Sequence, residues 1–317
     1  MPSKRLREPR LEDLFRTRNA AMRNVLDTVE KVLDHDVSIL ILGESGVGKD
    51  YLAQSIHACS ARRAEPFVHI ECASIPAELF ESELFGHERG TFTDAQTRKV
   101  GKLEAAGRGT VYFDEVASLT PQLQAKLLRV MQERRFSRLG GAATLPFEAR
   151  VITSSNADAA ALLASGALRQ DFYYRINVVT LTLPPLRERP EDVSALAKLF
   201  VKRTKFRRFD AEAERMMRGY AWPGNVRELR NAIERAGLVE ESDRITAASL
   251  PIHAESDLIT TAARGRWTLD ELESHYIREV LRMTRENYSR AAQILGINRK
   301  TLLEKRKKYG LDQARTP

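Results

Sequence analysis

The feature that most constrains this chain is a glycine-rich loop that directly follows a short apolar run. The run covers residues 37–42, and the loop reads Gly43-Glu44-Ser45-Gly46-Val47-Gly48-Lys49-Asp50. Glycines at this spacing allow main-chain amides to turn toward phosphate oxygens, and Lys49 supplies a positive charge at the β- and γ-phosphates. A helix expected over residues 49–59 would direct its positive N-terminal end to the same place. A glycine–lysine string alone arises by chance, but with its strand it predicts a nucleotide-binding α/β fold.

A buried strand ending in acidic residues is the expected partner of such a loop, and residues 110–115 (Thr-Val-Tyr-Phe-Asp-Glu) have this form. Asp114 would hold Mg²⁺ directly or through water, and Glu115 would orient and deprotonate the attacking water. An acidic pair can also belong to a solvated turn, but its place some sixty residues after the loop favours catalysis. In the general pattern a Ser or Thr binds the metal where Asp50 stands here. The two segments together predict ATP hydrolysis.

Residues 83–95 read Glu-Leu-Phe-Gly-His-Glu-Arg-Gly-Thr-Phe-Thr-Asp-Ala. They resemble the E-L-F-G-H-E-x-G-A-F-T-G-A signature of bacterial enhancer-binding proteins, the AAA+ activators of sigma-54 RNA polymerase. In that family the glycine loop usually ends in Lys-Glu or Lys-Asp, so Asp50 is expected there. Other segments match in order: residues 153–156, 168–175, 183–189 and 222–229. The resemblance covers residues 20–240 and the C-terminal tail, and implies an AAA+ P-loop NTPase with a parallel sheet and a small helical lid, followed by an all-α helix-turn-helix domain.

The resemblance also implies roles for residues outside the two nucleotide motifs. Asn156 would sense the γ-phosphate, and Arg227 would contact the nucleotide from the lid. Arg169 and Arg175 would reach the nucleotide of a neighbouring subunit, so hydrolysis would require a ring, usually a hexamer. The alternative for both arginines is an ordinary surface salt bridge, which is the commonest setting of arginine.

Phe92 and Thr93 would contact sigma-54 at the tip of an inserted loop, which a second insertion at residues 134–147 would support. Two neighbours depart from the family, since Thr91 replaces Ala and Asp94 replaces Gly. Glu71 stands where the family often has an asparagine that pairs with the catalytic glutamate. Adjacent carboxylates repel, so the departures leave the coupling of this loop to hydrolysis open.

Length and composition indicate an intracellular protein of at least two domains. The chain has 317 residues and two cysteines, Cys59 and Cys72, without the spacing of a metal site or a disulfide framework. It has no apolar run long enough to span a membrane, so we expect a cytoplasmic location. The expected divisions are a basic N-terminal segment, the ATPase core, its lid, a linker and a DNA-binding domain, at residues 1–16, 17–188, 189–245, 246–265 and 266–317.

Charge distribution assigns a polyanionic partner to the tail. Residues 266–317 hold 12 Lys and Arg against 7 Asp and Glu, residues 1–10 hold 4 against 1, and the rest of the chain is neutral. Residues 287–306 predict a short helix, a glycine turn at Gly296 and a second, basic helix. This is a helix-turn-helix pattern, whose second helix suits a major groove, although charge alone also fits a basic solvated helix. The candidate DNA contacts are Arg299, Lys300, Thr301, Lys305, Lys307 and Lys308.

The tail resembles the Fis-type module that ends enhancer-binding proteins. Within it Arg299 is the expected base contact and the lysines would mainly hold phosphates, while Glu304 departs from the basic residue often found there. Because two half-sites need a two-fold partner, the module would bind as a dimer. A preceding helix is expected over residues 267–285, with its apolar stripe at Leu269, Leu272, Tyr276, Val280 and Met283.

Two functions compete. The first is an ATP-dependent activator that binds upstream DNA and remodels sigma-54 RNA polymerase; the second is an ATP-binding, DNA-binding regulator that does not remodel sigma-54. A general AAA+ chaperone or helicase explains neither the sigma-54 signature nor the tail. Since about twenty residues precede the ATPase, we expect no N-terminal receiver domain and control by a separate protein, by expression or by the DNA.

Overall fold

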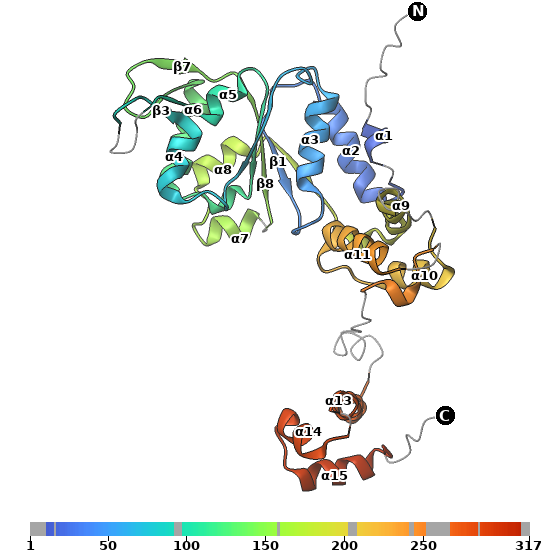
Figure 1. Ribbon diagram of the computed structural model, residues 1–317. Helices are drawn as coiled ribbons and strands as arrows, with labels where there is room; N and C mark the ends of the chain where they lie inside the picture. The colour runs from blue at the N-terminus through green and yellow to red at the C-terminus, as the bar shows by residue number, and fades with distance from the viewer. Residues whose placement is uncertain are drawn as a thin grey trace, which may run out of the picture. The chain divides into compact units, whose positions relative to one another are not determined.

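The computed structural model describes residues 11–15, 17–91, 97–156, 159–201, 208–240, 244–251, 267–284 and 286–311 (Figure 1). The chain divides into two compact units, residues 1–251 and 252–317.

The first unit contains a parallel five-stranded sheet in the order β2-β5-β8-β1-β9. The strands are β1 (Ile39–Leu42), β2 (Phe67–Glu71), β5 (Thr110–Asp114), β8 (Arg150–Ser155) and β9 (Val179–Thr182). β1, β5 and β8 lie inside the sheet and are buried along almost their whole length, as expected for parallel strands covered on both faces. Because parallel strands end at one edge, the loop after β1 and the acidic pair after β5 come together.

Helices cover both faces of this sheet (Figure 1). On one face lie α1 (Leu11–Leu14), α2 (Ala20–Val32) and α3 (Lys49–Cys59), whose apolar side chains pack with Ile39, Ile41 and Tyr112. On the other face Leu40, Val111 and Phe113 pack with the helices α4 (Ala77–Phe85), α5 (Lys102–Ala106), α6 (Pro121–Glu133), α7 (Ala159–Ala164) and α8 (Gln170–Ile176). The 3₁₀ turn η1 (Val116–Ser118) joins β5 to α6.

Two short hairpins extend from the sheet domain at the inserted segments. They are β3 (Gly86–His87) with β4 (Lys99–Val100), and β6 (Arg135–Ser137) with β7 (Thr144–Pro146). His87 bridges Leu139 of the second insertion. Arg138, 8% exposed, lies between Glu88 and Glu104 at 2.8 and 2.6 Å, so its buried charge is paired on both sides. The second insertion therefore buttresses the base of the first.

A helical subdomain follows the sheet. It comprises η2 (Leu186–Glu188), α9 (Pro190–Val201), α10 (Ala211–Gly219), α11 (Asn225–Val239) and η3 (Ala247–Ser249). Trp222, 1% exposed, anchors it, and its indole N–H donates to the carbonyl of Met217 at 2.8 Å. Ile245 and Leu250 are also buried, so packed residues reach further than the expected start of the linker at residue 246.

The second unit holds α13 (Leu269–Met283), α14 (Tyr288–Leu295) and α15 (Arg299–Lys308). Its core is Ile277, Val280 and Leu281 of α13 with Ala291, Ala292 and Leu302. The predicted stripe on α13 was therefore wrong at Leu269, Tyr276 and Met283, whereas Val280 is buried and Leu272 is half-buried. Leu269, Tyr276 and Met283 are exposed by 85%, 49% and 69%, because α14 and α15 pack against a neighbouring face of the helix. The expected fold class, including the helix-turn-helix, is otherwise confirmed.

Candidate nucleotide and DNA sites

The loop after β1 has the main-chain geometry of an anion cradle. Gly46 and Gly48 have φ angles of +74° and +105°, which side chains rarely adopt. A Cβ at Gly48 would meet no heavy atom within 4 Å, whereas a Cβ at Gly46 would lie 2.5 Å from the carbonyl oxygen of Gly224. Gly48 thus opens onto free space at the start of α3, while Gly46 permits the helical subdomain to pack on the loop.

Lys49 is 6% exposed, and its ammonium group is held entirely by oxygen atoms. It donates to the carbonyls of Gly43 at 2.8 Å and Glu44 at 3.2 Å, and to the side-chain oxygen of Asn156. Burial lowers the pKa of Lys49, and the nearby carboxylates of Glu115 and Asp114 oppose this effect. The structure thus brings together two predicted residues, Lys49 at the start of α3 and Asn156 directly after β8.

The acidic pair lies beside them at the end of β5. One oxygen of Asp114 accepts hydrogen bonds from the hydroxyls of Tyr112, at 3.0 Å, and Ser154. Burial raises the pKa of Tyr112 far above its usual range, so this hydroxyl stays protonated and donates. Sequence reasoning missed Tyr112, whose only signal is a hydroxyl two positions before the acid on the same face of a strand.

Glu115 adopts a left-handed conformation with a φ of +56°, uncommon for a residue other than glycine. Its carboxylate accepts from the amide N–H of Asn156 at 3.2 Å and the hydroxyl of Ser155 at 3.4 Å, while its own N–H donates to Ser154 Oγ at 3.1 Å. Glu71, exposed at the end of β2, is the register partner of Asp114 rather than of Glu115.

Two residues of the helical subdomain, Arg227 and Asn225, form hydrogen bonds with the loop. Arg227 donates to Ser45 Oγ at 2.9 Å, and its N–H donates to the carbonyl of Gly46 at 3.1 Å. Asn225, fully buried, donates to Glu44 at 3.0 Å and to the carbonyl of Ser45 at 3.1 Å. The predicted residue Arg227 thus reaches the loop, and Asn225 is a partner for which sequence reasoning gave no role.

An ion pair completes this junction. The Arg187 guanidinium forms two hydrogen bonds with Glu44, at 2.8 and 2.5 Å. Hydrogen bonds from Arg187, and then from Asn225, lower the pKa of Glu44 to about 2. Arg189, 5% exposed, donates to the carbonyl of Val47 at 3.0 Å. Arg187 and Arg189 therefore hold the loop at Glu44 and Val47 against the helical subdomain.

The residues present fit a nucleotide with magnesium. Mg²⁺ is commonly held by one or two carboxylates together with substrate phosphates, and Asp114 offers one oxygen beyond the one its neighbours occupy. Among the described residues no cluster of three or more His, Cys, Asp or Glu side chains forms a metal cage. Asp50, on the first turn of α3, is exposed.

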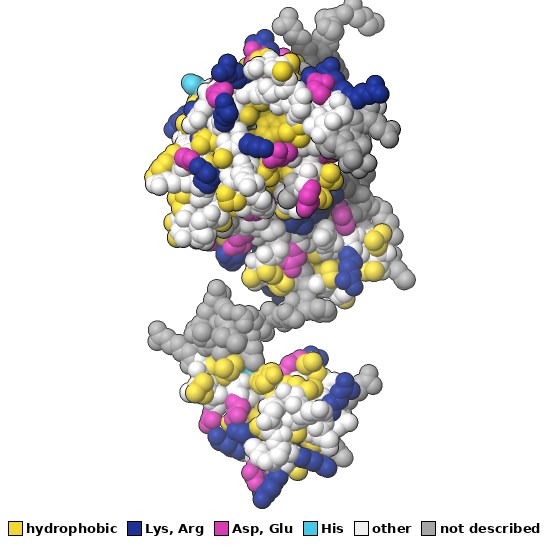
Figure 2. Space-filling view, turned by 90° about the vertical axis from the view of Figure 1, so that its left-hand side faces the viewer, with side chains coloured by type: hydrophobic (Ala, Val, Ile, Leu, Met, Phe, Trp, Pro, Cys, Tyr) yellow, Lys and Arg dark blue, Asp and Glu magenta, His cyan; other side chains and the backbone are white. Residues whose placement is uncertain are grey.

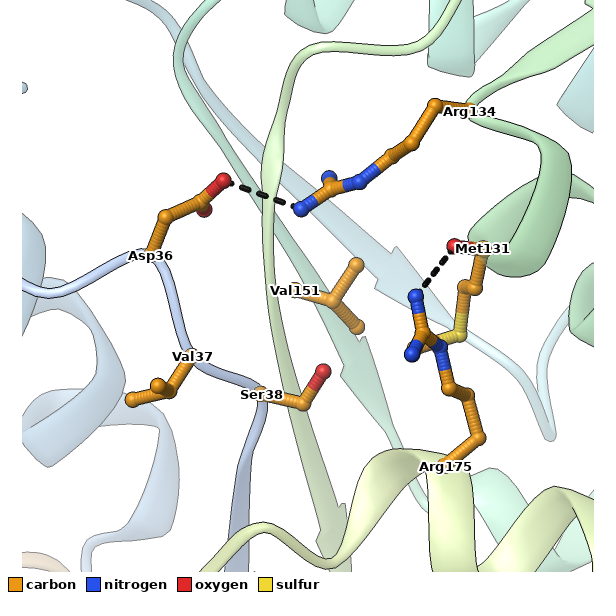
Figure 3. Close-up of a pocket in the computed structure, with 7 residues that line it drawn as sticks. All are labelled: Asp36, Val37, Ser38, Met131, Arg134, Val151 and Arg175. Carbon is orange, nitrogen blue, oxygen red and sulfur yellow. Dashed lines mark hydrogen bonds and ion pairs between the residues drawn. The ribbon is translucent and has the colours of Figure 1, made fainter.

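The two predicted arginine fingers lie at different ends of α8. Arg169, before the helix, forms an ion pair with Asp171 at 2.6 Å. Arg175, in its last turn, donates to the carbonyl of Met131 at 2.5 Å and lines a small pocket beside Ser38 (Figure 3). Ser38 precedes β1, whereas the glycine loop follows it, so Arg175 lies at the edge of the sheet opposite to the loop of its own subunit.

Phe92, Thr93 and Asp94 lie outside the described residues. Thr91, directly before them, donates through its hydroxyl to the carbonyls of Glu88 at 2.6 Å and Leu139 at 3.1 Å. The family's alanine could not make either bond, so the substitution ties this loop to the second insertion.

In the second unit Asn298 caps α15 by accepting from the N–H of Thr301 at 2.8 Å. Arg299, Lys300 and Lys307 are exposed. Lys305 instead pairs with Glu273 at 2.7 Å, and Lys308 with Asp270 at 3.0 Å. Two of the predicted DNA contacts are therefore held by carboxylates of α13 in this structure.

Comparison with family models assigns most of the chain. Residues 15–182 match the sigma-54 interaction domain. Residues 187–264 match the AAA+ ATPase lid domain, and residues 268–309 match the bacterial regulatory protein, Fis family. The chain belongs to the sigma-54-dependent regulators. It combines the ATP-binding AAA+ domain of these transcription activators with a Fis-type DNA-binding helix-turn-helix.

Curated bacterial regulatory proteins resemble the chain almost throughout. The regulatory protein AtoC of Escherichia coli is 40% identical over 94% of this chain and 68% of its own length. The transcriptional regulatory protein ZraR of Klebsiella oxytoca is 41% identical over 90% of this chain and 66% of its own length. The chain thus spans about two thirds of the length of these relatives.

No described helix is long and apolar enough to cross a membrane.

A solved structure shares the fold over almost the whole chain. The structure of NtrX from Brucella abortus in complex with ATP aligns with a TM-score of 0.68 and 34% identity, over 93% of this chain and 68% of that one. The same protein in complex with ADP aligns with a TM-score of 0.67.

Proposed function

We propose that this chain is an ATP-dependent transcription activator that binds upstream DNA and uses ATP hydrolysis in an oligomeric ring to remodel sigma-54 RNA polymerase in the cytoplasm. The observation that carries the proposal is the meeting of Lys49, Asn156 and Glu115 at one edge of the sheet. Lys49 donates to the Asn156 side chain, and the Asn156 N–H donates to Glu115. A charge for phosphate, a polar sensor and a candidate base therefore form one connected group.

The chemistry assigned to these side chains follows from their surroundings. Lys49 and the main-chain amides of residues 43–50 would bind the phosphates of ATP. Asp114 would hold Mg²⁺, which would neutralise charge on the phosphates. Glu115 would orient and deprotonate water, and its bonds to residues 155 and 156 fix the direction of its carboxylate.

A shared active site explains the positions of the arginines. Arg175 lies at the sheet edge away from its own loop, beside Met131 and Ser38, so it would act on the nucleotide of a neighbour. Within the part of the chain that the structure describes, Arg169 pairs with Asp171 two residues away, an exposed pair of small energy that a phosphate could replace. Such a finger contributes on the order of 10³ to 10⁵ in rate.

Two variants separate nucleotide binding from hydrolysis. Lys49→Ala should weaken ATP binding, since Lys49 contacts phosphates in the ground state. Glu115→Ala should bind ATP and fail to turn it over, because Glu115 acts on the water in the transition state. Calorimetric affinity and steady-state ATPase rates of both variants measure this, and undiminished hydrolysis by Glu115→Ala would remove Glu115 from the mechanism.

The decisive experiment for the whole proposal is ATP-dependent transcription from a sigma-54 promoter with purified components. Phe92→Ala should abolish open-complex formation while ATP hydrolysis and DNA binding persist. A wild-type protein that hydrolyses ATP and binds DNA but forms no open complex would instead establish the second candidate, a regulator that does not remodel sigma-54. The departures at Thr91 and Asp94 favour testing that candidate directly.

A further inference from the structure

The helix α15 has a buried face and an exposed face, and the residues on each face are three or four positions apart. Leu302, fully buried, shares one face with Lys305 and Arg306, which lie three and four positions later and are half-buried. Lys300, Leu303, Glu304 and Lys307 are also three or four positions apart, and all four are exposed. The inner face packs on the unit, and the outer face is left for a partner.

Cations on the edges and inner face are neutralised from within the unit. Glu273 binds Lys305, Asp270 binds Lys308, and the hydroxyl of Tyr309 donates to both carboxylates. Hydrogen bonds from Lys308 lower the pKa of Asp270, and those from Lys305 lower the pKa of Glu273, so both acids stay ionised. Arg306 lies over the ring of Tyr288 and 3.7 Å from Glu286. On α15 the positive charge left for a polyanion is concentrated at Arg299, Lys300 and Lys307.

Leu303 lies between these cations and is 43% exposed. The exposed part of this leucine gains nothing from folding, because it stays in water. Its neighbour Glu304 repels phosphates, so this part of the outer face suits base edges better than the DNA backbone. Figure 2 shows hydrophobic and basic side chains together on the surface of this unit. In a major groove the apolar group on a base edge is the C5-methyl of thymine.

We propose that Leu303 is a specificity-determining residue that packs against the C5-methyl group of a thymine in the major groove. Lys300 and Lys307, three positions before and four after it, would hold the flanking phosphates on the two strands. The proposal rests on DNA binding by the second unit and adds which base that helix selects.

The test removes only the methyl group. A duplex enriched from a random pool by the wild-type full chain serves as the probe, and each thymine is replaced in turn by uracil, which keeps every hydrogen bond. One replacement should weaken binding about 3- to 5-fold, as expected for one buried methyl. Leu303→Ala should bind the thymine duplex more weakly by a similar factor and should no longer distinguish thymine from uracil there.

Two further variants keep the result interpretable. Leu303→Met should retain the preference for thymine, since methionine keeps an apolar side chain at that place. Ile294→Ala, which truncates another side chain that is 49% exposed in the same unit, should leave the uracil response unchanged. Unfolding curves of all variants report whether the unit remains folded.

Undiminished uracil sensitivity in Leu303→Ala would overturn the proposal, as would a wild-type protein that responds to no uracil replacement or enriches sites without thymine. Failure of the wild-type chain to enrich any duplex would be a different result, because it would refute DNA binding itself.

Discussion

The hydroxyl of Tyr112 donates a 3.0 Å hydrogen bond to the carboxylate of Asp114, two residues further along the same strand. The Tyr112 ring is buried and stacks against His69 at 5.0 Å, so the hydroxyl has little freedom to turn away. The residue assigned to Mg²⁺ is thereby oriented by a side chain that takes no part in nucleotide binding.

Tyr112→Phe should therefore lower kcat for ATP about 2- to 10-fold, as expected for one lost hydrogen bond, and should raise the Mg²⁺ concentration needed for half-maximal rate. Ser154 still holds Asp114 in this variant, so the loss should be partial. Tyr174→Phe, at a tyrosine that is 64% exposed, is the matched control. Equal Mg²⁺ dependence in wild type and Tyr112→Phe would show that the hydroxyl does not position the metal ligand.

Glu44 should contribute to stability in a pH-dependent way. Its pKa falls from 4.5 to about 2 because Arg187 and Asn225 donate to its ionised form. A carboxyl whose pKa is lower in the folded state stabilises above its unfolded pKa, and that contribution is lost as pH falls toward the folded pKa. The Glu44→Gln variant should thus melt below wild type at neutral pH, and the difference should shrink from about pH 4.5 toward about pH 2.

Thermal unfolding of both proteins across this range measures the effect. Glu148→Gln, at an exposed pair 3.8 Å from Arg108, is the control and should shift the midpoint little at any pH. A difference for Glu44→Gln that grows on acidification would contradict the assigned ion pair.

The shared active site predicts complementation between two inactive proteins. Arg175→Ala lacks a finger and Glu115→Ala lacks the base, so a mixed ring would contain some interfaces with both residues intact. Specific ATPase activity should also rise with protein concentration. Constant specific activity down to a verified monomer, together with inactive mixtures, would place the whole site in one subunit.

Gly140 and Thr91 should be energetically coupled. Gly140 has a φ of +69°, and a Cβ there would lie 2.5 Å from Thr91 Oγ1. Gly140→Ala should lower the free energy of unfolding by about 1–2 kcal/mol because of the left-handed conformation. The steric contact between the new methyl group and the Thr91 side chain should lower it further, and Thr91→Ala should relieve that contact. A double-mutant cycle from denaturant unfolding would isolate this term, and strictly additive costs would exclude the contact.

The lysines of α15 should behave differently from one another. Lys307→Ala should weaken binding to all DNA sequences and lower the salt slope by about 1. Lys305→Ala should leave the slope nearly unchanged and destabilise the second unit, because Glu273 loses the cation 2.7 Å away and keeps only the hydrogen bond from Tyr309 among its described partners. Salt titrations of DNA binding, together with unfolding curves, distinguish the two variants. Equal salt slopes for both variants would show that Lys305 contacts phosphates as Lys307 does.

Features with local signals could be predicted from the amino-acid sequence. The strand, glycine loop and helix at residues 39–59 follow from turn chemistry and apolar patterning within twenty positions, and so does the turn at Gly296 between two helices. The family signatures added the lid. Each of these signals depends on residues that are close together in the sequence, so no distant contact is needed to recognise it.

Contacts between side chains that are far apart in the sequence depend on the three-dimensional packing. Glu44 and Arg187 lie 143 positions apart, and no local pattern pairs one of many arginines with one of many acids. On α13 two apolar stripes share helical spacing, and packing against Ala291 and Leu302 selected Ile277 and Leu281 over Tyr276 and Met283. Periodicity identifies a helix, but the neighbours that fill the core decide which of its faces is buried, and those neighbours come from elsewhere in the chain.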